Sequence, residues 1–217
     1  MIRAILAHTA PMIPALILVA GKSTRMGRLK ATLPVDAVNP AGDTFLTRIL
    51  RTFQAADVDD LVVVVGCEAE AVVESVVSRG LSPRFVNNRD YESGQLSSLL
   101  AGLRAIDRPG VNAMLLMLVD APLVSPATVR LVVERYRTTG APIVRPVDRA
   151  DGSRHGHPVL VDRSLFDALR AADPATGAKP VVRAHVSAEG NVEVDDEGAF
   201  ADVDTPEDYQ RLSTRTS

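Results

Sequence analysis

The sequence predicts an α/β fold of three layers, with a mainly parallel β-sheet between two layers of helices. Short apolar runs that suit strands alternate along the chain with segments whose apolar residues recur at helical spacing. Several runs are hydrophobic at every position, as expected for parallel strands that helices cover on both faces. The 217 residues are 46% hydrophobic, which suits one large domain with a sizeable core.

The first half of the chain shows this alternation most clearly. Strands are predicted at 16–20, 61–65, 84–86 and 113–119, and helices at 45–53, 68–79, 95–106 and from 125 to about 139. Thr44 and Ser125 are suited to cap two of these helices, because their hydroxyl oxygens can accept hydrogen bonds from unpaired N–H groups. Gly80 ends the helix that precedes it.

The second half is less regular, and an antiparallel strand at one edge of the sheet is possible there. Strands are predicted at 141–147, 158–161 and 191–194, and helices at 162–172, 180–185 and after Thr205. Thr205, Pro206 and Glu207 form a strong helix start, with a cap, a proline at the first position and an acid in the first turn. No linker is evident, so we expect one domain over 13–217 and an N-terminal extension over 1–12.

Composition excludes several classes of function. The net charge of −3 offers no general attraction for nucleic acid. A single cysteine, Cys67, excludes internal disulfides and multi-cysteine metal sites, and a buried, inert thiol is the favoured interpretation. No apolar run approaches the roughly 20 residues of a membrane span, and residues 1–14 do not resemble a signal peptide, so we expect a cytoplasmic protein without membrane contact.

A basic, glycine-containing loop follows the first predicted strand. Gly21 and Gly27 allow a close backbone approach, and the loop carries four cations: Lys22, Arg25, Arg28 and Lys30. Glycine together with Arg and Lys at the end of a strand is what binding of a triphosphate requires. The loop is not a P-loop, because Leu16 stands where that motif needs glycine. The alternative is a solvated basic turn.

Three polar segments follow strands and should meet at the carboxyl edge of the sheet: 20–30, 87–98 and 120–122. Asp120 ends the most hydrophobic strand, where a carboxylate can hold Mg²⁺. Asp202 and Asp204 alternate along the chain, so on an extended backbone they point the same way and could reach the same metal. The alternatives are a turn residue at 120 and simple capping of the last helix by the acidic segment.

Two further segments contain candidate ligand-binding groups. Residues 94–98 start a helix, and the side chains of Gln95 and Ser97 could read a base or ribose, although helix capping explains them equally well. His155 and His157 form a His-x-His pair, but no third ligand is spaced to complete a zinc site. A hydrogen-bonding acceptor pocket or a structural turn is therefore the favoured interpretation of the pair.

These motifs, taken in order, resemble the MobA-like NTP transferases, with the molybdenum cofactor cytidylyltransferases as the nearest branch. The resemblance runs from Ile13 to about Leu212. It rests on Leu18-Val19-Ala20-Gly21-x-Ser23-x-Arg25-Met26-Gly27-x-x-Lys30, Gly94-Gln95-x-Ser97-Ser98-Leu99, Asp120-x-Pro122-Leu123, Gly156-His157-Pro158-Val159 and Asp202-Val203-Asp204-Thr205-Pro206-Glu207-Asp208.

The resemblance implies a Rossmann-like fold of the nucleotide-diphospho-sugar transferase type and a single nucleotidyltransferase domain. It implies Mg²⁺-dependent transfer of a nucleoside monophosphate from an NTP, with CTP favoured, to a phosphorylated acceptor, with release of pyrophosphate. Molybdopterin is the expected acceptor, and a transient contact with a molybdoenzyme would follow. The alternatives are a sugar phosphate or another small phosphorylated metabolite as acceptor, or a non-catalytic nucleotide-binding partner of a molybdoenzyme.

The resemblance also implies roles for individual residues. Arg25, Lys30 and Asp120 would be catalytic, and Asp120 would hold Mg²⁺ with Asp202 or Asp204 as a second carboxylate. His155 and His157 would face the acceptor. The implied nucleotide-binding residues are Ala20, Gly21, Lys22, Ser23, Arg25, Gly27, Lys30, Gln95 and Ser97.

Overall fold

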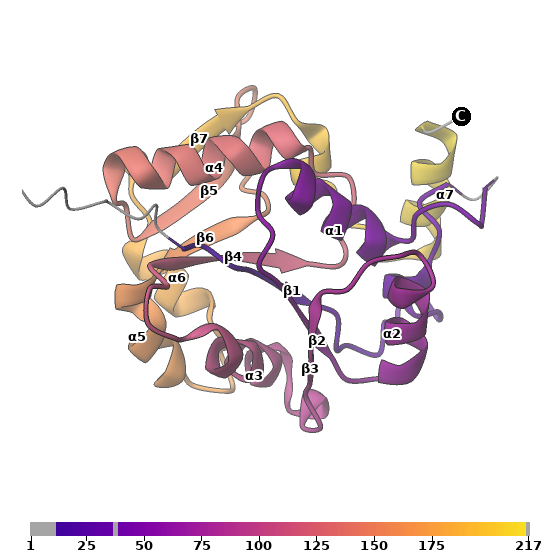
Figure 1. Ribbon diagram of the computed structural model, residues 1–217. Coiled ribbons are helices and arrows are strands. Elements are labelled where there is room, and N and C mark those ends of the chain that lie inside the picture. The colour runs from indigo at the N-terminus through magenta and orange to yellow at the C-terminus, as the bar shows by residue number, and fades with distance from the viewer. Residues whose placement is uncertain (1–11, 37–38, 216–217) are drawn as a thin grey trace, which may run out of the picture.

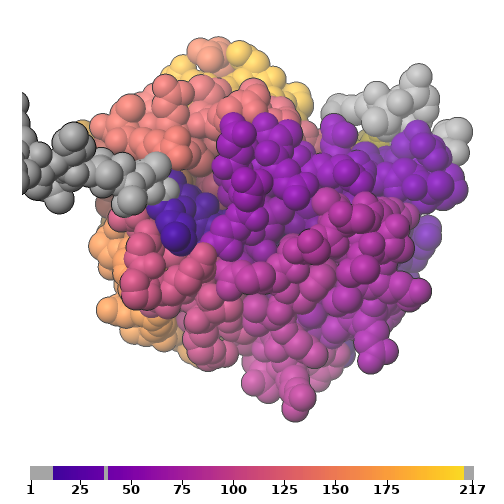
Figure 2. Space-filling view, viewed as in Figure 1, coloured from indigo at the N-terminus to yellow at the C-terminus, as the bar shows by residue number. Residues whose placement is uncertain are grey.

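The computed structural model of the chain describes residues 12–36 and 39–215. Most of the expected N-terminal extension and the last two residues of the expected domain therefore lie outside the described residues. A central sheet runs through the molecule, with α1 and α4 above it and α3 and α5 below it (Figure 1). In the space-filling view from the same side, the first half of the chain, in purple and magenta, forms most of this face, with α4 above it (Figure 2).

The sheet has seven strands in the order β3-β2-β1-β4-β6-β5-β7. All neighbouring pairs are parallel except those that β6 makes with β4 and β5. The strands are β1 (Ala15–Leu18), β2 (Leu61–Val65), β3 (Arg84–Asn87), β4 (Ala113–Leu118), β5 (Ile143–Asp148), β6 (Val159–Asp162) and β7 (Asn191–Val194). In the register of β1 with its neighbours, Leu18 pairs with Val64 on one side and Leu118 on the other, so the three strands end at one edge.

Helices cover both faces of the sheet, which confirms the three-layer prediction. One core cluster joins alternate strand residues such as Ile17 to α1, α2 and α4, and a second joins Leu16 and Leu18 to α3 and α5, with α6 packed against it. The helices are α1 (Phe45–Ala55), α2 (Ala69–Val77), α3 (Gln95–Ile106), α4 (Pro126–Thr139), α5 (Phe166–Arg170), α6 (Lys179–His185) and α7 (Pro206–Arg215). Among the described residues, no helix is long and apolar enough to cross a bilayer.

The elements follow the sequence prediction closely apart from small shifts of their ends, and three differences stand out. The bounds of β2 and α3 are as expected, and Thr44 and Ser125 cap α1 and α4 through bonds from the N–H groups of Thr47 and Thr128. The antiparallel strand lies inside the sheet, not at its edge. The first strand ends at Leu18, two residues early, and the helix expected over 162–172 is a 3₁₀ turn followed by the short α5.

Close packing against β1 and β2 fixes the position of α3. A Cβ at Gly102 would lie 2.3 Å from Leu16 Cδ1 and 2.9 Å from Val64 Cγ2, so only glycine fits the present spacing. Leu16 and Val64 are fully buried, which leaves their side chains little room to move. Gly102 therefore lets α3 lie close to the sheet and sets where its first turn meets the carboxyl edge.

We expect Gly102→Ala to lower the free energy of unfolding by about 1–3 kcal/mol, because overpacking outweighs the better helix propensity of alanine. Urea denaturation would measure the change. Gly152→Ala is the matched control, because a Cβ there meets nothing within 4 Å and its φ is not positive. Equal stability of the two variants would contradict the close packing of α3.

Candidate nucleotide-binding site

The basic loop after β1 is held in one conformation by a turn and an apolar anchor. Ser23 and Gly27 have φ of +51° and +66°, and the Gly27 N–H donates to the carbonyls of Ser23 and Thr24. The Met26 side chain is buried in a small core cluster. The Lys30 N–H donates to Ser23 Oγ at 3.3 Å and so closes the loop.

The cations of the loop converge on one carboxylate. Lys30 Nζ lies 2.5 Å from Asp204 Oδ1, and Arg25 Nη1 lies 2.8 Å from Asp204 Oδ2. Only 9% of the Lys30 side chain is exposed, whereas 70% of the Arg25 side chain is. The hydrogen bond from Lys30, and then the charge of Arg25, lower the pKa of Asp204 below its usual value. Asp204 therefore remains ionised and orients both cations.

The segment before α7 places Asp204. Asp208 Oδ2 accepts from the Thr205 N–H at 2.9 Å and the Asp208 N–H donates to Thr205 Oγ1 at 3.2 Å, which is a reciprocal capping box. The same Oδ2 accepts from the Asp204 N–H at 3.2 Å. Val203 is buried, and its N–H donates to the Asp120 carbonyl at 2.8 Å. The acidic segment is thus both a helix cap, as one alternative held, and part of the site.

Asp120 lies beyond the end of β4 with one side-chain oxygen unsatisfied. Its Oδ1 is buried and accepts no hydrogen bond within the described protein. Burial, and then the charge of Asp202, raise the pKa of Asp120. His157 also lies beside the two acids, yet burial lowers its pKa more than their charges raise it. A cation at this point would satisfy the orphaned oxygen and relieve the repulsion between the carboxylates.

The acids are better suited to a cation that substrate phosphates also bind than to a cation held by protein ligands alone. Among the described residues, no three His, Cys, Asp or Glu side chains are grouped so as to hold a metal ion. Mg²⁺ is typically held by one or two carboxylates together with substrate phosphates. Asp120, with Asp202 beside it, fits that pattern, whereas Lys30 and Arg25 already occupy both oxygens of Asp204.

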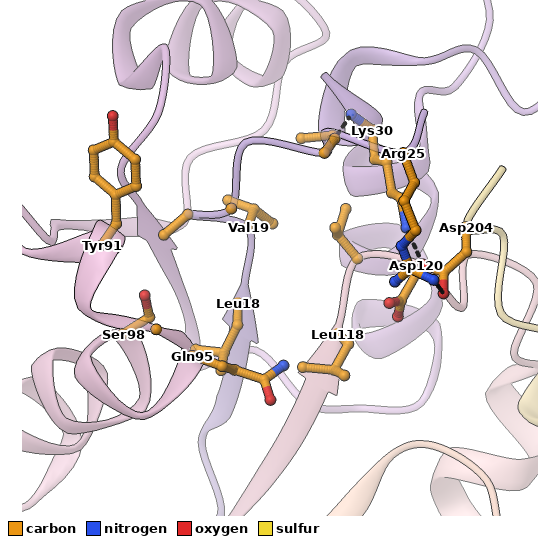
Figure 3. Close-up of a pocket in the computed structure, with 16 residues that line it drawn as sticks. Leu18, Val19, Arg25, Lys30, Tyr91, Gln95, Ser98, Leu118, Asp120 and Asp204 are labelled. Atoms are coloured by element: carbon orange, nitrogen blue, oxygen red, sulfur yellow. Dashed lines mark hydrogen bonds and ion pairs between the residues drawn. The ribbon is translucent and has the colours of Figure 1, made fainter. Parts of the chain in front are cut away.

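A cavity of about 310 Å³ opens at this edge of the sheet. Arg25, Lys30, Asp120 and Asp204 stand at one end, and Tyr91, Gln95 and Ser98 stand at the other (Figure 3). The remaining lining is small or apolar: Leu18, Val19, Ala20, Gly21, Ser23, Ala31, Gly94, Leu118 and Val119. The cavity therefore has a charged end and a neutral end joined by an apolar floor, which suits a nucleotide.

Several of the expected site residues do not line this cavity. Lys22 forms an ion pair with Glu92, Ser97 Oγ donates to the backbone carbonyls of Asp90 and Gly94, and Gly27 shapes the loop turn. His155 is exposed overall, but the partial burial of its ring, and then the charge of Arg145, lower the pKa of the imidazole. His157 lies beside Asp120 and Asp202, just beyond the cavity lining. The two histidines therefore lie in different environments, and only His157 is beside the acids.

Tyr91 and Ser98 also line the neutral end of the cavity, although neither was predicted as a site residue. Asn88, a buried polar residue, donates from Nδ2 to Ser97 Oγ at 2.9 Å and Ser98 Oγ at 3.0 Å, and so fixes the first turn of α3. Ser98 directly follows Ser97 in the motif that spans Gly94 to Leu99, so that motif was a signal for it. Tyr91 lies in an irregular polar segment, where the spacing of residues does not predict which way a side chain points.

The model of the MobA-like NTP transferase domain matches residues 15–189. The chain belongs to the MobA-like NTP transferase family. Its fold is accordingly the Rossmann-like fold of the nucleotide-diphospho-sugar transferases, and the protein is a nucleotidyltransferase of this family.

Named relatives align with nearly the whole length of the chain. The nicotine blue oxidoreductase of Paenarthrobacter nicotinovorans is 32% identical over 93% of the chain and 97% of its own length. A probable molybdenum cofactor guanylyltransferase of Natronomonas pharaonis is 27% identical over 93% of the chain and 96% of its own length. These names denote different activities, so membership of the MobA-like family does not by itself define the acceptor.

Solved structures agree with the MobA-like fold. The crystal structure of Rv0371c from Mycobacterium tuberculosis superposes with a TM-score of 0.74 at 31% identity, covering 95% of this chain and 99% of that one. The same protein has been solved in complex with manganese, with a TM-score of 0.70 at 27% identity over 94% of this chain and 98% of that one. A related protein thus binds a divalent metal ion.

Removal of the Asp204 charge should destabilise the protein. We expect Asp204→Asn to lower the free energy of unfolding by about 2 kcal/mol, because Lys30 is left buried without its counter-ion. The pKa of Asp204 is lowered on folding, so its contribution is complete above about pH 4 and is lost as the pH falls through the lower, folded value. Urea denaturation between pH 7 and pH 3 would show the difference shrinking. Glu207→Gln, on the first turn of α7, is the exposed control; an equal loss there would refute the role of Asp204.

Proposed function

We propose that the protein transfers a nucleoside monophosphate from an NTP, with CTP favoured, to a phosphorylated acceptor, and that molybdopterin is this acceptor. One observation carries the proposal: two cations and an unsatisfied carboxylate share one end of a cavity whose other end is neutral. Arg25 and Lys30 can hold a triphosphate, and Asp120 can hold the Mg²⁺ that accompanies it. The family membership supports the reaction type, and the motif resemblance supports the choice of CTP and molybdopterin.

The reaction needs charge neutralisation more than it needs covalent help from the protein. An oxygen of the acceptor phosphate attacks the α-phosphorus of the NTP, and a new phosphoanhydride bond forms. The bond between the α-phosphorus and the bridging oxygen of the β-phosphate breaks, and pyrophosphate leaves with the electron pair. Arg25 and Lys30 stabilise the negative charge that develops on this leaving group. A bound divalent cation at Asp120 would supply further charge neutralisation between protein and phosphates.

The neutral end of the cavity suits the base and ribose. Ala20 and Gly21 present almost no side chain, so a flat ring can approach the backbone closely. Gln95 carries both a donor and an acceptor, and its amide has no hydrogen-bond partner among the described residues, so it is available to the edge of a base. Ser98 Oγ adds a further hydroxyl at the same end.

A comparison of four nucleotides tests the proposal directly. With Mg²⁺, CTP should raise the melting temperature of the full chain more than ATP, GTP or UTP, because binding to the native state stabilises it. Addition of molybdopterin should then release pyrophosphate, which a coupled phosphate assay measures, while glucose 1-phosphate should not. A stronger response to another nucleotide would correct the base, release with glucose 1-phosphate would correct the acceptor, and stabilisation without release would indicate a non-catalytic binding protein.

Loss of the Asp120 charge should stop turnover without unfolding the protein. We expect Asp120→Asn to reduce metal-dependent pyrophosphate release by at least about 100-fold, because the amide cannot neutralise a divalent cation. Its stability in urea should stay the same or rise, since burial and Asp202 already disfavour this charge. The control is Asp59→Asn, an exposed acid just before β2 at the opposite edge of the sheet. Turnover like that of wild type in Asp120→Asn would remove Asp120 from the metal site.

A further inference from the structure

Asn88 follows β3 directly and is a buried polar residue, with only 5% of it exposed. Its N–H donates to the Val65 carbonyl at 2.8 Å, which ties the residue to the end of β2. Its side chain reaches the first turn of α3, where Gln95 and Ser98 line the cavity (Figure 3). Asn88 itself does not line the cavity, so it acts on a bound molecule only through its neighbours.

The partners of the Asn88 amide determine which way it is turned. Its Oδ1 accepts from the Asp90 N–H at 3.1 Å, and a backbone N–H can only donate, so an acceptor must face it. The amide nitrogen therefore faces the two serines, with Nδ2 at 2.9 Å from Ser97 Oγ and 3.0 Å from Ser98 Oγ. Because this nitrogen only donates, both hydroxyl oxygens accept from Asn88.

The two hydroxyl groups differ in where their own protons go. Ser97 Oγ donates to nearby backbone carbonyls, the closer of which lies at 2.8 Å. Ser98 Oγ accepts from Asn88, and among the described residues it has no acceptor for its proton. Only 4% of Ser98 is exposed, and it lines the neutral end of the cavity. A molecule bound in the cavity is therefore the natural acceptor of the Ser98 proton.

The bond from Asn88 gives the Ser98 hydroxyl a fixed polarity. An unconstrained serine hydroxyl rotates and either donates or accepts, so it does not distinguish a donor on a ligand from an acceptor. With a donor behind it, the Ser98 hydroxyl turns its proton away from Asn88 and toward the cavity. The neutral end of the cavity therefore presents a hydrogen-bond donor at this point.

We propose that Asn88 is a positioning residue that makes Ser98 a donor to the base, and that the atom it meets is the O2 carbonyl oxygen of a pyrimidine; the inference rests on the proposed function. With the phosphates at the charged end, the Watson–Crick edge of the base enters the neutral end. Cytosine and uracil carry O2 at one corner of that edge, whereas guanine carries its N2 amino group there and adenine a C–H. A fixed donor therefore pairs with a pyrimidine and is left unpaired by a purine.

Reversal of the polarity tests the proposal. Calorimetry on the full chain with Mg²⁺ should show CTP and UTP binding to wild type at least about tenfold more tightly than GTP and ATP, since an unpaired buried donor is costly. Asn88→Asp replaces the amide nitrogen by an oxygen that only accepts, so the Ser98 proton turns toward residue 88 and lone pairs face the ligand. At pH 8, which favours the ionised carboxylate, the ratio of the GTP to the CTP dissociation constant should fall at least about tenfold.

Two further variants accompany Asn88→Asp. Asn87→Asp is the matched control, because it adds the same charge one residue earlier on an exposed side chain, and it should keep the wild-type ratio. Ser98→Ala removes the donor with a small side chain that suits a helix, so it tests the proposal even where Asn88→Asp does not fold. It should weaken CTP and UTP about tenfold and change GTP and ATP by less than about twofold.

The ratio of dissociation constants separates a positioning role from a merely structural one. If Asn88 only supports the first turn of α3, its replacement weakens all four nucleotides alike and leaves the ratio unchanged, which would refute the proposal. Purine nucleotides that bind wild type as tightly as pyrimidine nucleotides, or an equal loss of all four in Ser98→Ala, would also refute it. The nucleotide site would stand in each of these cases, provided that pyrophosphate is released with some NTP. Absence of both NTP binding and pyrophosphate release in wild type would overturn the proposed function, and this inference with it.

Discussion

The site depends on the bond between the Asp204 carboxylate and the Lys30 ammonium, which joins residues 174 positions apart in the sequence. An ammonium as buried as that of Lys30 is costly to desolvate unless a counter-ion lies beside it. The basic loop after β1 can therefore hold its cation in the cavity only when the segment before α7 has docked. The proposed phosphate binding is consequently a property of the assembled domain and not of a local loop motif.

The three acids of the site, Asp120, Asp202 and Asp204, lie in two different electrostatic environments. Val203 is buried between the two acids, Asp202 and Asp204. Asp204 meets two cations and its pKa falls, whereas the charge of Asp202 raises the pKa of Asp120. One carboxylate is thus neutralised within the protein, and the other two repel each other. This repulsion, together with the unsatisfied Oδ1 of Asp120, favours an external cation at this point.

The sequence predicted the parts of the molecule that local pattern controls. Apolar runs and helix caps predicted β2, α3 and the start of α1. Polar residues that follow predicted strands indicated the basic loop and Asp120 as site residues. Partners could not be predicted, because a hydroxyl or a lysine binds whatever the fold brings near. Ser97 thus bonds to nearby backbone and Lys22 to Glu92, and Asp204, one of the two candidates for the second metal ligand, pairs with Lys30 and Arg25.

The direction of β6 was also beyond local pattern, and it explains why His157 reaches the site. Strand β4 ends at the carboxyl edge, and a parallel neighbour would bring its own carboxyl end there. Because β6 runs antiparallel, with Val159 opposite Leu116, its amino end lies at this edge, and His157, two residues earlier, comes level with Leu118. Gly156 permits the approach, since a Cβ there would lie 2.2 Å from the Ala199 carbonyl oxygen, to which the His157 N–H donates. Because β6 is antiparallel, a residue that precedes a strand, His157, brings its imidazole to this edge of the sheet. Parallel strands would place there only the residues that follow each strand.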